Sequence, residues 1–143
     1  MSTLNTAVSV AASALSAERT RIEVAVSNLA NAESTRGPDG KPYRRRDVVL
    51  STAPMQSFDS ALGRASATGV EVSAIVEDTS RPRLRYDPSH PDANKDGFVE
   101  LPNVTAAEEM VDMVGASRAY QANLTAIGLI RDLTSRALEL GRG

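Results

Sequence analysis

Apolar side chains recur at a seven-residue interval along the N-terminal part of the chain. One row consists of Val8, Leu15, Ile22 and Leu29. The complementary heptad row consists of Leu4, Ala11, Ala25 and Ala32, with Glu18 as its one interruption. Two rows at this spacing are typical of a helix that presents an apolar seam to another helix. Because neither Pro nor Gly occurs before Gly37, we predict a single helix over residues 4–32.

A second helical pattern covers residues 105–140. Thr105 followed three residues later by Glu108 matches a capping box, and Glu109 adds negative charge to the first turn, where it favours the helix dipole. The apolar positions first follow a seven-residue pattern and then shift to a neighbouring stripe: Met110, Met113, Tyr120, Leu124 and Ile127, then Ile130, Leu133, Ala137 and Leu140. Gly141 is the expected stop signal.

Between the two helices the pattern changes to short β-type runs. Residues 44–50 and 70–76 are rich in Val and Ile, residues 83–86 alternate Arg with Leu and Tyr, and residues 98–101 form a fourth run. These runs predict a small sheet of three or four strands, with Leu84 and Tyr86 half-buried. The Ser- and Ala-rich stretch at about 51–68 predicts a long flexible loop.

The order of these elements predicts an α+β fold. We expect long N- and C-terminal helices that pack as an α-helical coiled-coil or tube domain, with a small β-rich insert between them. The N-terminal helix would occupy residues 1–35, the insert 36–103 and the C-terminal helix 104–143, and the insert would stand apart as a separate module. The periodicity alone fits two arrangements equally well: a two-helix core within one chain, or helices assembled from many copies.

Composition indicates a thin core. The 143 residues include no Trp, two Phe and three Tyr, and much of the hydrophobic content is Ala. Ala buries little surface, so the usual gain of about 25 cal/mol per Å² of buried apolar area is small. A chain of this composition is expected to complete its core against partners.

Charge and cysteine content exclude several classes of function. The net charge is −2 and the pI about 5.4, so no overall basic field favours nucleic acid, and the cluster Arg44–Arg46 is too short to change that expectation. The absence of cysteine excludes disulfides and thiolate sites. The sequence contains no run of 18 apolar residues, so we predict no insertion into a membrane. The N-terminus also lacks the pattern of a cleaved secretory signal.

Residues 92–103 match part of a calcium-loop template. Asp92, Asn94, Asp96 and Gly97 occupy positions 1, 3, 5 and 6, but position 12 is Asn103, where such loops need a bidentate Glu. Nearby prolines also disfavour the flanking helices that such a loop requires. A polar turn before a short strand is therefore favoured. A calcium-responsive binding module that uses these residues is the alternative function.

The sequence contains no recognisable catalytic set. The one histidine, His90, lies between two prolines and is expected to be a surface turn residue. The chain has no cysteine nucleophile, no Gly-x-Ser-x-Gly elbow and no glycine-rich phosphate loop. We therefore expect a protein that is not an enzyme and that uses no metal or cofactor.

Several motifs together resemble a known family. The stretch ALSAERTRIEVAVSNLANAEST at 14–35 is similar to the N-terminal signature of the bacterial flagellar rod and hook axial proteins. Segments 42–50, 69–104 and 108–127 resemble the proximal-rod branch of that family. The resemblance extends in order over essentially the whole chain. It implies that 92–103 is a turn leading to the second helix.

The resemblance implies a structural subunit of the flagellar basal-body proximal rod. Terminal helices of many subunits would pack coaxially into a drive shaft that crosses the periplasm and transmits motor torque to the hook. The implied partners are copies of the chain itself, other rod subunits, the membrane–rod junction protein, the distal rod and the flagellar type III export apparatus, which exports such proteins without a cleaved signal.

Together, the heptads and the resemblance predict the residues that pack subunits together. In the first helix they are Leu4, Val8, Leu15, Ile22 and Leu29. In the second they are Met113, Tyr120, Leu124, Ile127, Ile130 and Leu133. Asn28, Asn31 and Asn123 are expected to be polar ties between helices or at helix ends, with a solvated polar face as the alternative.

Overall fold

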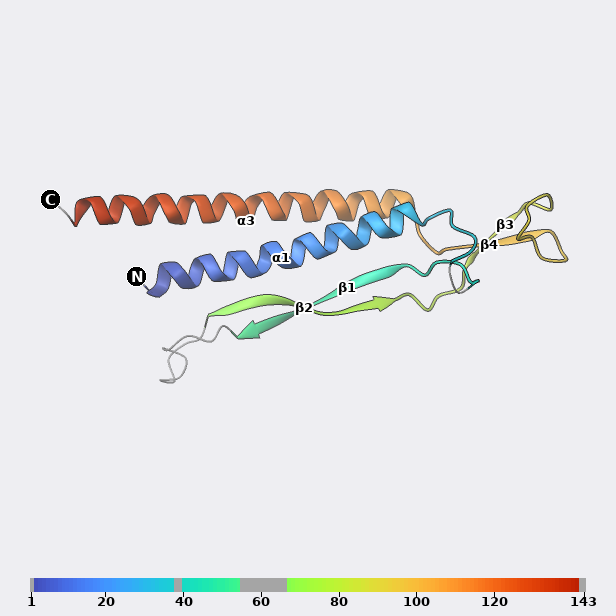
Figure 1. Ribbon diagram of the computed structural model, residues 1–143, viewed down its shortest axis with the longest axis horizontal. Helices are drawn as coiled ribbons and strands as arrows, with labels where there is room; N and C mark the ends of the chain where they lie inside the picture. The colour runs from blue at the N-terminus through green and yellow to red at the C-terminus, as the bar shows by residue number, and fades with distance from the viewer. Residues whose placement is uncertain (1, 38–39, 55–66, 142–143) are drawn as a thin grey trace.

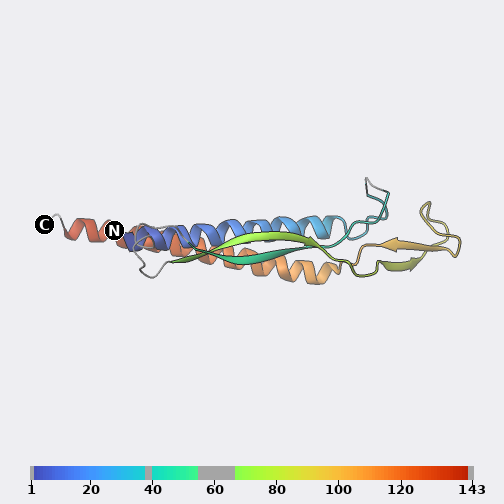
Figure 2. The same ribbon diagram turned by 90° about the horizontal axis from the view of Figure 1, so that it is seen from below.

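The computed structural model describes residues 2–37, 40–54 and 67–141, and it is an elongated α+β molecule. In chain order the elements are α1 Ser2–Ala30, β1 Arg46–Pro54, β2 Thr68–Glu77, β3 Arg83–Tyr86, β4 Phe98–Leu101 and α3 Ala106–Leu140. The two helices lie side by side and antiparallel, and β3 and β4 project from one end, while both termini lie toward the other (Figures 1 and 2). The predicted α+β class, with its long terminal helices, is confirmed.

The helical pair has a core built largely of alanine. The buried apolar side chains of the two helices and of the turn after α1 are Ala11, Ala17, Ala25, Ala32 and Ala116. Three of these belong to the heptad row that the sequence assigned to the seam. Small side chains bring helix backbones close together but remove little surface from water, so the packed interior is thin.

Helix α3 has α1 as its single neighbour among the described helices and strands. The half-buried side chains of α3 therefore share the face of Ala116, which points toward α1, and the rest of the helix surface is uncovered by any described element. No helix of the described residues is long and apolar enough to cross a membrane.

Strands β1 and β2 form an antiparallel two-stranded ribbon. The register runs from Arg46 opposite Glu77 to Pro54 opposite Thr68, with an irregularity between Val49 and Leu50. The ribbon lies along α1 on the side away from α3 (Figure 1), and the N–H of Val70 donates to Oγ of Ser13 at 3.1 Å. The ribbon is thus attached to the helices, contrary to the separate module expected.

Two further expectations about the insert are wrong. The strands form two separate two-stranded sheets, β1–β2 and β3–β4, in place of one sheet of three or four strands. The expected loop at 51–68 is too long, because 51–54 continue β1 and 68 begins β2. Backbone pairing across the ribbon outweighs the weak strand propensity of Ser and Ala there. Residues 55–66 lie outside the described part of the chain.

The β3–β4 hairpin has one inward and one outward face. Val99 and Leu101 are buried on the inward face. Leu84 and Tyr86, on the outward face, are 62% and 65% exposed, so the expectation that these two side chains are half-buried is wrong. The arginines of β3 fix the inward face. Arg83 donates to the carbonyl oxygens of Pro102 and Ala32, and Arg85 pairs with Glu33 at 2.7 Å.

The expected capping box at the start of α3 does not form. Thr105 is the N-cap residue, but its side chain makes no capping hydrogen bond. The N–H of Glu109 donates to the carbonyl of Thr105 at 3.1 Å, and the side chain of Glu109 turns into the interior. Glu109, the residue after Glu108 of the motif, is therefore the acidic residue that this helix start buries.

Candidate functional site: a buried polar junction

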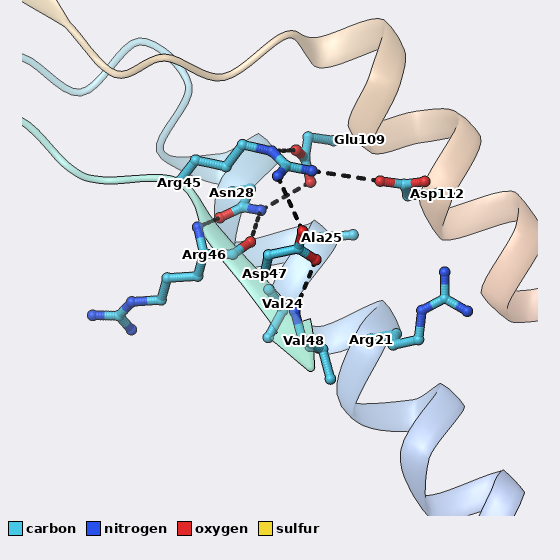
Figure 3. Close-up of a pocket in the computed structure, with 10 residues that line it drawn as sticks. All are labelled: Arg21, Val24, Ala25, Asn28, Arg45, Arg46, Asp47, Val48, Glu109 and Asp112. Atoms are coloured by element: carbon cyan, nitrogen blue, oxygen red, sulfur yellow. Dashed lines mark hydrogen bonds and ion pairs between the residues drawn. The ribbon is translucent and has the colours of Figure 1, made fainter. Parts of the chain in front are cut away.

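A cluster of polar side chains joins α1, α3 and the start of β1. Asn28 of α1 is 1% exposed and Glu109 of α3 is 2% exposed, and each is fully surrounded by protein. Arg45 and Arg46 approach from the strand side, and the four residues meet as shown in Figure 3. We refer to Asn28, Arg45, Arg46 and Glu109, together with Tyr43, as the polar junction.

Asn28 satisfies its whole side-chain amide at the junction. Its Nδ2 donates to the carbonyl of Arg46 at 2.8 Å and to Oε2 of Glu109 at 2.9 Å. Its Oδ1 accepts from the N–H of Arg46 at 2.9 Å and from the hydroxyl of Tyr43 at 2.9 Å. The amide therefore pairs with both main-chain groups of Arg46, as a residue of a neighbouring strand would.

Glu109 receives a second, charged donor from the loop before β1. Nε of Arg45 donates to its Oε1 at 2.6 Å, and the same guanidinium lies 3.6 Å from a carboxylate oxygen of Asp112 and of Asp47. The Glu109 carboxylate thus accepts on both oxygens. A charge this deeply buried is tolerated only when it is paired and hydrogen-bonded in this way.

The electrostatics of the junction favour the charged form of Arg45. Partial burial of Arg45 by itself lowers the pKa of the guanidinium, but the hydrogen bond and negative charge of Glu109 outweigh it, and Asp47 and Asp112 add to the effect. The pKa of Arg45 consequently lies above its ordinary value. None of the buried side-chain polar atoms in the described residues lacks a hydrogen-bond partner.

The junction is built to hold elements together and leaves no room for a ligand. The cavity it lines measures about 30 Å³, which admits water but is far below the size of a small-molecule pocket. The described residues contain no group of three His, Cys, Asp or Glu side chains that could hold a metal ion. The arrangement can fix the relative positions of three elements.

Sequence reasoning anticipated Asn28 but missed Arg45 and Glu109. The sequence pattern accounts for Glu109 as a favourable charge in the first helix turn and for Arg45 only as part of the short basic cluster Arg44–Arg46. The two lie 64 positions apart in the chain, so no local pattern links them. Two adjacent acidic residues at a helix start do not show which of them is covered, so the sequence held no local signal for the burial of Glu109.

The other predicted polar ties bind within their own helices. Nδ2 of Asn31 donates to the carbonyl of Ser27 at 2.8 Å, just past the end of α1. Nδ2 of Asn123 donates to the carbonyl of Ala119 at 2.9 Å inside α3. Of the three asparagines, only Asn28 makes a side-chain hydrogen bond to another element among the described residues.

The predicted packing residues fall into two groups. Leu124 and Leu133 are exposed on α3. The remaining nine are half-buried, and they are Leu4, Val8, Leu15, Ile22, Leu29, Met113, Tyr120, Ile127 and Ile130. Leu4, Val8 and Ile130 line one groove between the two helices.

The turn at 92–103 directs its polar groups to protein donors. The carboxylate of Asp92 accepts from Thr35 at 2.8 Å and pairs with Arg36 at 2.6 Å. Oδ1 of Asn94 accepts the N–H groups of Asp96 and Phe98, both at 2.9 Å. These bonds build a turn, and the geometry gives no support to a calcium loop.

Comparison with known proteins decides the family. A family described as flagella basal body rod protein matches residues 4–38, and one described as flagellar basal body rod FlgEFG protein C-terminal matches residues 95–140. The flagellar basal-body rod protein FlgC of Bacillus subtilis is 44% identical, over 94% of this chain and 96% of that protein. Those of Borreliella burgdorferi and Salmonella typhimurium are 40% and 41% identical, over 98% and 93% of this chain and 99% and 94% of theirs.

The chain belongs to the FlgC family of flagellar basal-body rod proteins. The resemblance drawn from the sequence is confirmed, and with it the assignment to a structural rod subunit of the flagellar basal body. The two matched segments supply Asn28 and Glu109, while Arg45 comes from the stretch between them. The relatives are named as rod proteins, which fits the expected non-enzymatic function.

Proposed function

We propose that this rod subunit forms part of the drive shaft that transmits motor torque to the hook. Its terminal helices would pack coaxially with those of further copies and of other rod proteins. The neighbours would be the other proximal rod subunits, the membrane–rod junction protein and the distal rod. The chain would reach this position through the flagellar type III export apparatus, without a cleaved signal.

The observation that carries the proposal is the uncovered surface of α3. Large apolar side chains stand exposed along most of its length, and these are Met110, Val111, Val114, Leu124, Leu129, Leu133, Leu138 and Leu140. Among the described elements only α1 covers this helix. Exposed apolar surface on this scale marks an interface, and packing against neighbouring subunits would remove it from water.

We further propose that the chain has two structural regions. Residues 1–35 and 104–143 would form the axial helical domain, and residues 36–103 the β-rich insert on its outside. The packing residues predicted from the sequence would lie at or beside the subunit contacts, with Leu124 and Leu133 as the most accessible of them. Asn31 and Asn123 would add polar ties between subunits.

The polar junction is suited to withstand mechanical force between the insert and the helices. Torque that passes between the insert and the helices would load the point where β1 begins, beside the end of α1 and the start of α3. That point carries the hydrogen bonds of Asn28 to Arg46 and the ion pair of Arg45 with Glu109. A hydrogen-bonded buried pair resists displacement because separating its members leaves each one desolvated and unpaired.

The test is a charge placed on the exposed face of α3. Leu124→Glu is expected to abolish rod assembly and swimming in cells, because a carboxylate cannot be buried in an apolar subunit contact without a partner. Export of the chain and helix content of the purified protein should be unchanged, since Leu124 is about half exposed in the isolated chain. Gln121→Glu, at an exposed polar site one turn away, is the matched control. Normal swimming with Leu124→Glu would contradict the proposed packing.

A further inference from the structure

The outward side of the β3–β4 hairpin is an exposed apolar surface. Leu84 pairs with Glu100 and Tyr86 with Phe98 across the two strands, so the four side chains share one face. We call these four residues the hairpin face. Val99 and Leu101, on the opposite face, are buried.

Aromatic side chains make the hairpin face unusual for this chain. The sequence has two Phe and three Tyr in total, and one of each stands exposed here. Their rings meet edge to face with centroids 5.3 Å apart. Exposed aromatic pairs are typical of the central, energetically dominant part of a protein interface.

A hollow borders the hairpin face. It has a volume of about 160 Å³ and a largely polar lining, made of Phe98 and Glu100 from β4, Asp92 and Asn94 from the turn before it, and Thr35, Arg36, Gly40 and Pro42 from the segment after α1. The hairpin face is therefore a flat aromatic platform with a recess at one side. Such a shape fits the side chains of a helix laid across it.

The opposite end of the molecule presents a complementary surface. Leu129, Leu133, Arg136 and Leu140 follow one another at intervals of four, three and four residues, which places them on one side of α3. We call them the C-terminal stripe. The three leucines are between 59% and 85% exposed. In Figures 1 and 2 this end of α3 projects beyond the start of α1.

Each of the two surfaces has one charge in its middle, and the charges are opposite. Glu100 is exposed on the hairpin face and Arg136 is exposed on the C-terminal stripe. Within the part of the chain that the structure describes, neither side chain takes part in an ion pair. A guanidinium set among leucines matches a carboxylate beside aromatic rings, both by charge and by cation–π attraction.

We propose that the C-terminal stripe of one copy docks on the hairpin face of the next copy, with Arg136 opposite Glu100. The occupant is a second copy because the same chain carries both halves of the contact at its two ends. A contact between two different surfaces of identical subunits repeats without closing on a pair and so builds an open helical array. This proposal rests on the proposed function as a rod subunit and names the axial contact within it.

Disulfide trapping tests the contact directly, because the natural chain contains no cysteine. Leu84→Cys and Leu133→Cys are placed in the same chain, which is allowed to assemble in flagellated cells and is then oxidised. Leu84 belongs to β3 and Leu133 to the C-terminal part of α3, which lie at opposite ends of the molecule (Figures 1 and 2), so any bond between the two cysteines joins two copies. The expected result is a ladder of dimers, trimers and longer products on a non-reducing gel. Leu84→Cys with Leu124→Cys, which lies off the C-terminal stripe, is the control and should give no ladder.

Charge exchange gives a second readout. Glu100→Arg alone and Arg136→Glu alone are each expected to reduce the trapped product by roughly tenfold, because like charges then face each other. The two changes combined should restore the ladder. Both sites are exposed, so neither variant is expected to disturb folding. Equal ladders in all four chains, or failure of the combined variant to recover, would overturn the proposal.

The two proposals fail in different ways. If purified basal bodies contain the chain and the cells swim, but no copy-to-copy ladder forms, the rod assignment stands and the head-to-tail contact is wrong. A cross-linked product that contains a different rod protein, identified by mass, would also overturn the choice of a second copy as the occupant. Absence of the chain from basal bodies would contradict the proposed function itself.

Discussion

The side-chain amide of Asn28 and the carboxylate of Glu109 lie 2.9 Å apart, although 81 positions separate them in the sequence. This one hydrogen bond connects the end of the first helix to the start of the last. The main chain of Arg46 lies on the same amide, so the contact also fixes the entry of the β insert.

Removing the Asn28 amide should be costly. Asn28→Ala removes one donor from the buried carboxylate of Glu109 and removes both hydrogen bonds to the main chain of Arg46. We expect the free energy of unfolding to fall by about 2–4 kcal/mol, measured by urea denaturation of the purified chain. Asn123→Ala is the control, because that amide bonds only within its own helix among the described residues. Its effect should stay within about 0.5 kcal/mol, and an equally small effect at Asn28 would contradict a structural role for the junction.

The Arg45–Glu109 pair should show strong coupling. Glu109→Leu alone removes the closest counter-charge of the partly buried Arg45, leaving Asp47 and Asp112 at 3.6 Å, and is expected to lower the free energy of unfolding by about 3 kcal/mol. Replacing both residues, as Arg45→Met with Glu109→Leu, should recover most of this loss, because an apolar pair needs no charge compensation. A double-mutant cycle measures the coupling energy. Simple additivity of the two single changes would show that the ion pair does not act as a unit.

Asp92 should make stability depend on acid. The hydrogen bond from Thr35, helped by the charge of Arg36, holds the pKa of Asp92 below its ordinary value. A carboxyl with a depressed folded pKa contributes stability above its unfolded pKa, which is about 4, and the contribution is lost as the pH falls through the folded pKa. Carboxyl NMR titration should show the pKa of Asp92 rising toward the ordinary value in Thr35→Val. An unchanged titration in that variant would contradict the assigned cause.

Gly97 should tolerate no side chain. Its φ is +81°, and an added Cβ would lie 2.9 Å from Cε2 of Tyr86. Gly97→Ala is therefore expected to cost about 2–3 kcal/mol in the free energy of unfolding. Gly40→Ala separates the two causes, because Gly40 has a φ of +77° with no heavy atom within 4 Å of the added Cβ. Its cost should be the backbone part alone, about 1–2 kcal/mol. Equal costs at the two sites would show that the Tyr86 ring moves aside freely.

The helices could be read from the sequence because their information is local. Ala11, Ala25 and Ala32 of the complementary heptad row are buried, and the first helix ends at Ala30, two residues before the predicted end. Repeating apolar positions specify which face of a helix is covered without reference to the covering element.

The β insert and the junction depended on information that is not local. The four strand-like runs could be located, but their division into two ribbons depends on which strands pair. The alternation at Leu84 and Tyr86 predicted burial of a face that is exposed, because alternation does not say which face is covered. At Glu109, burial followed from a partner 64 positions away, while the capping motif beside it remained unused.

The way Asn28 binds Arg46 has a mechanical consequence. A strand that is held by a single hydrogen bond can rotate about that bond. Asn28 instead binds both the N–H and the carbonyl of Arg46 through one planar amide, and two points define an axis. The Arg45–Glu109 pair adds a third point beside that axis. Three points of attachment fix orientation as well as position, so the start of the ribbon is held in one orientation relative to the two helices.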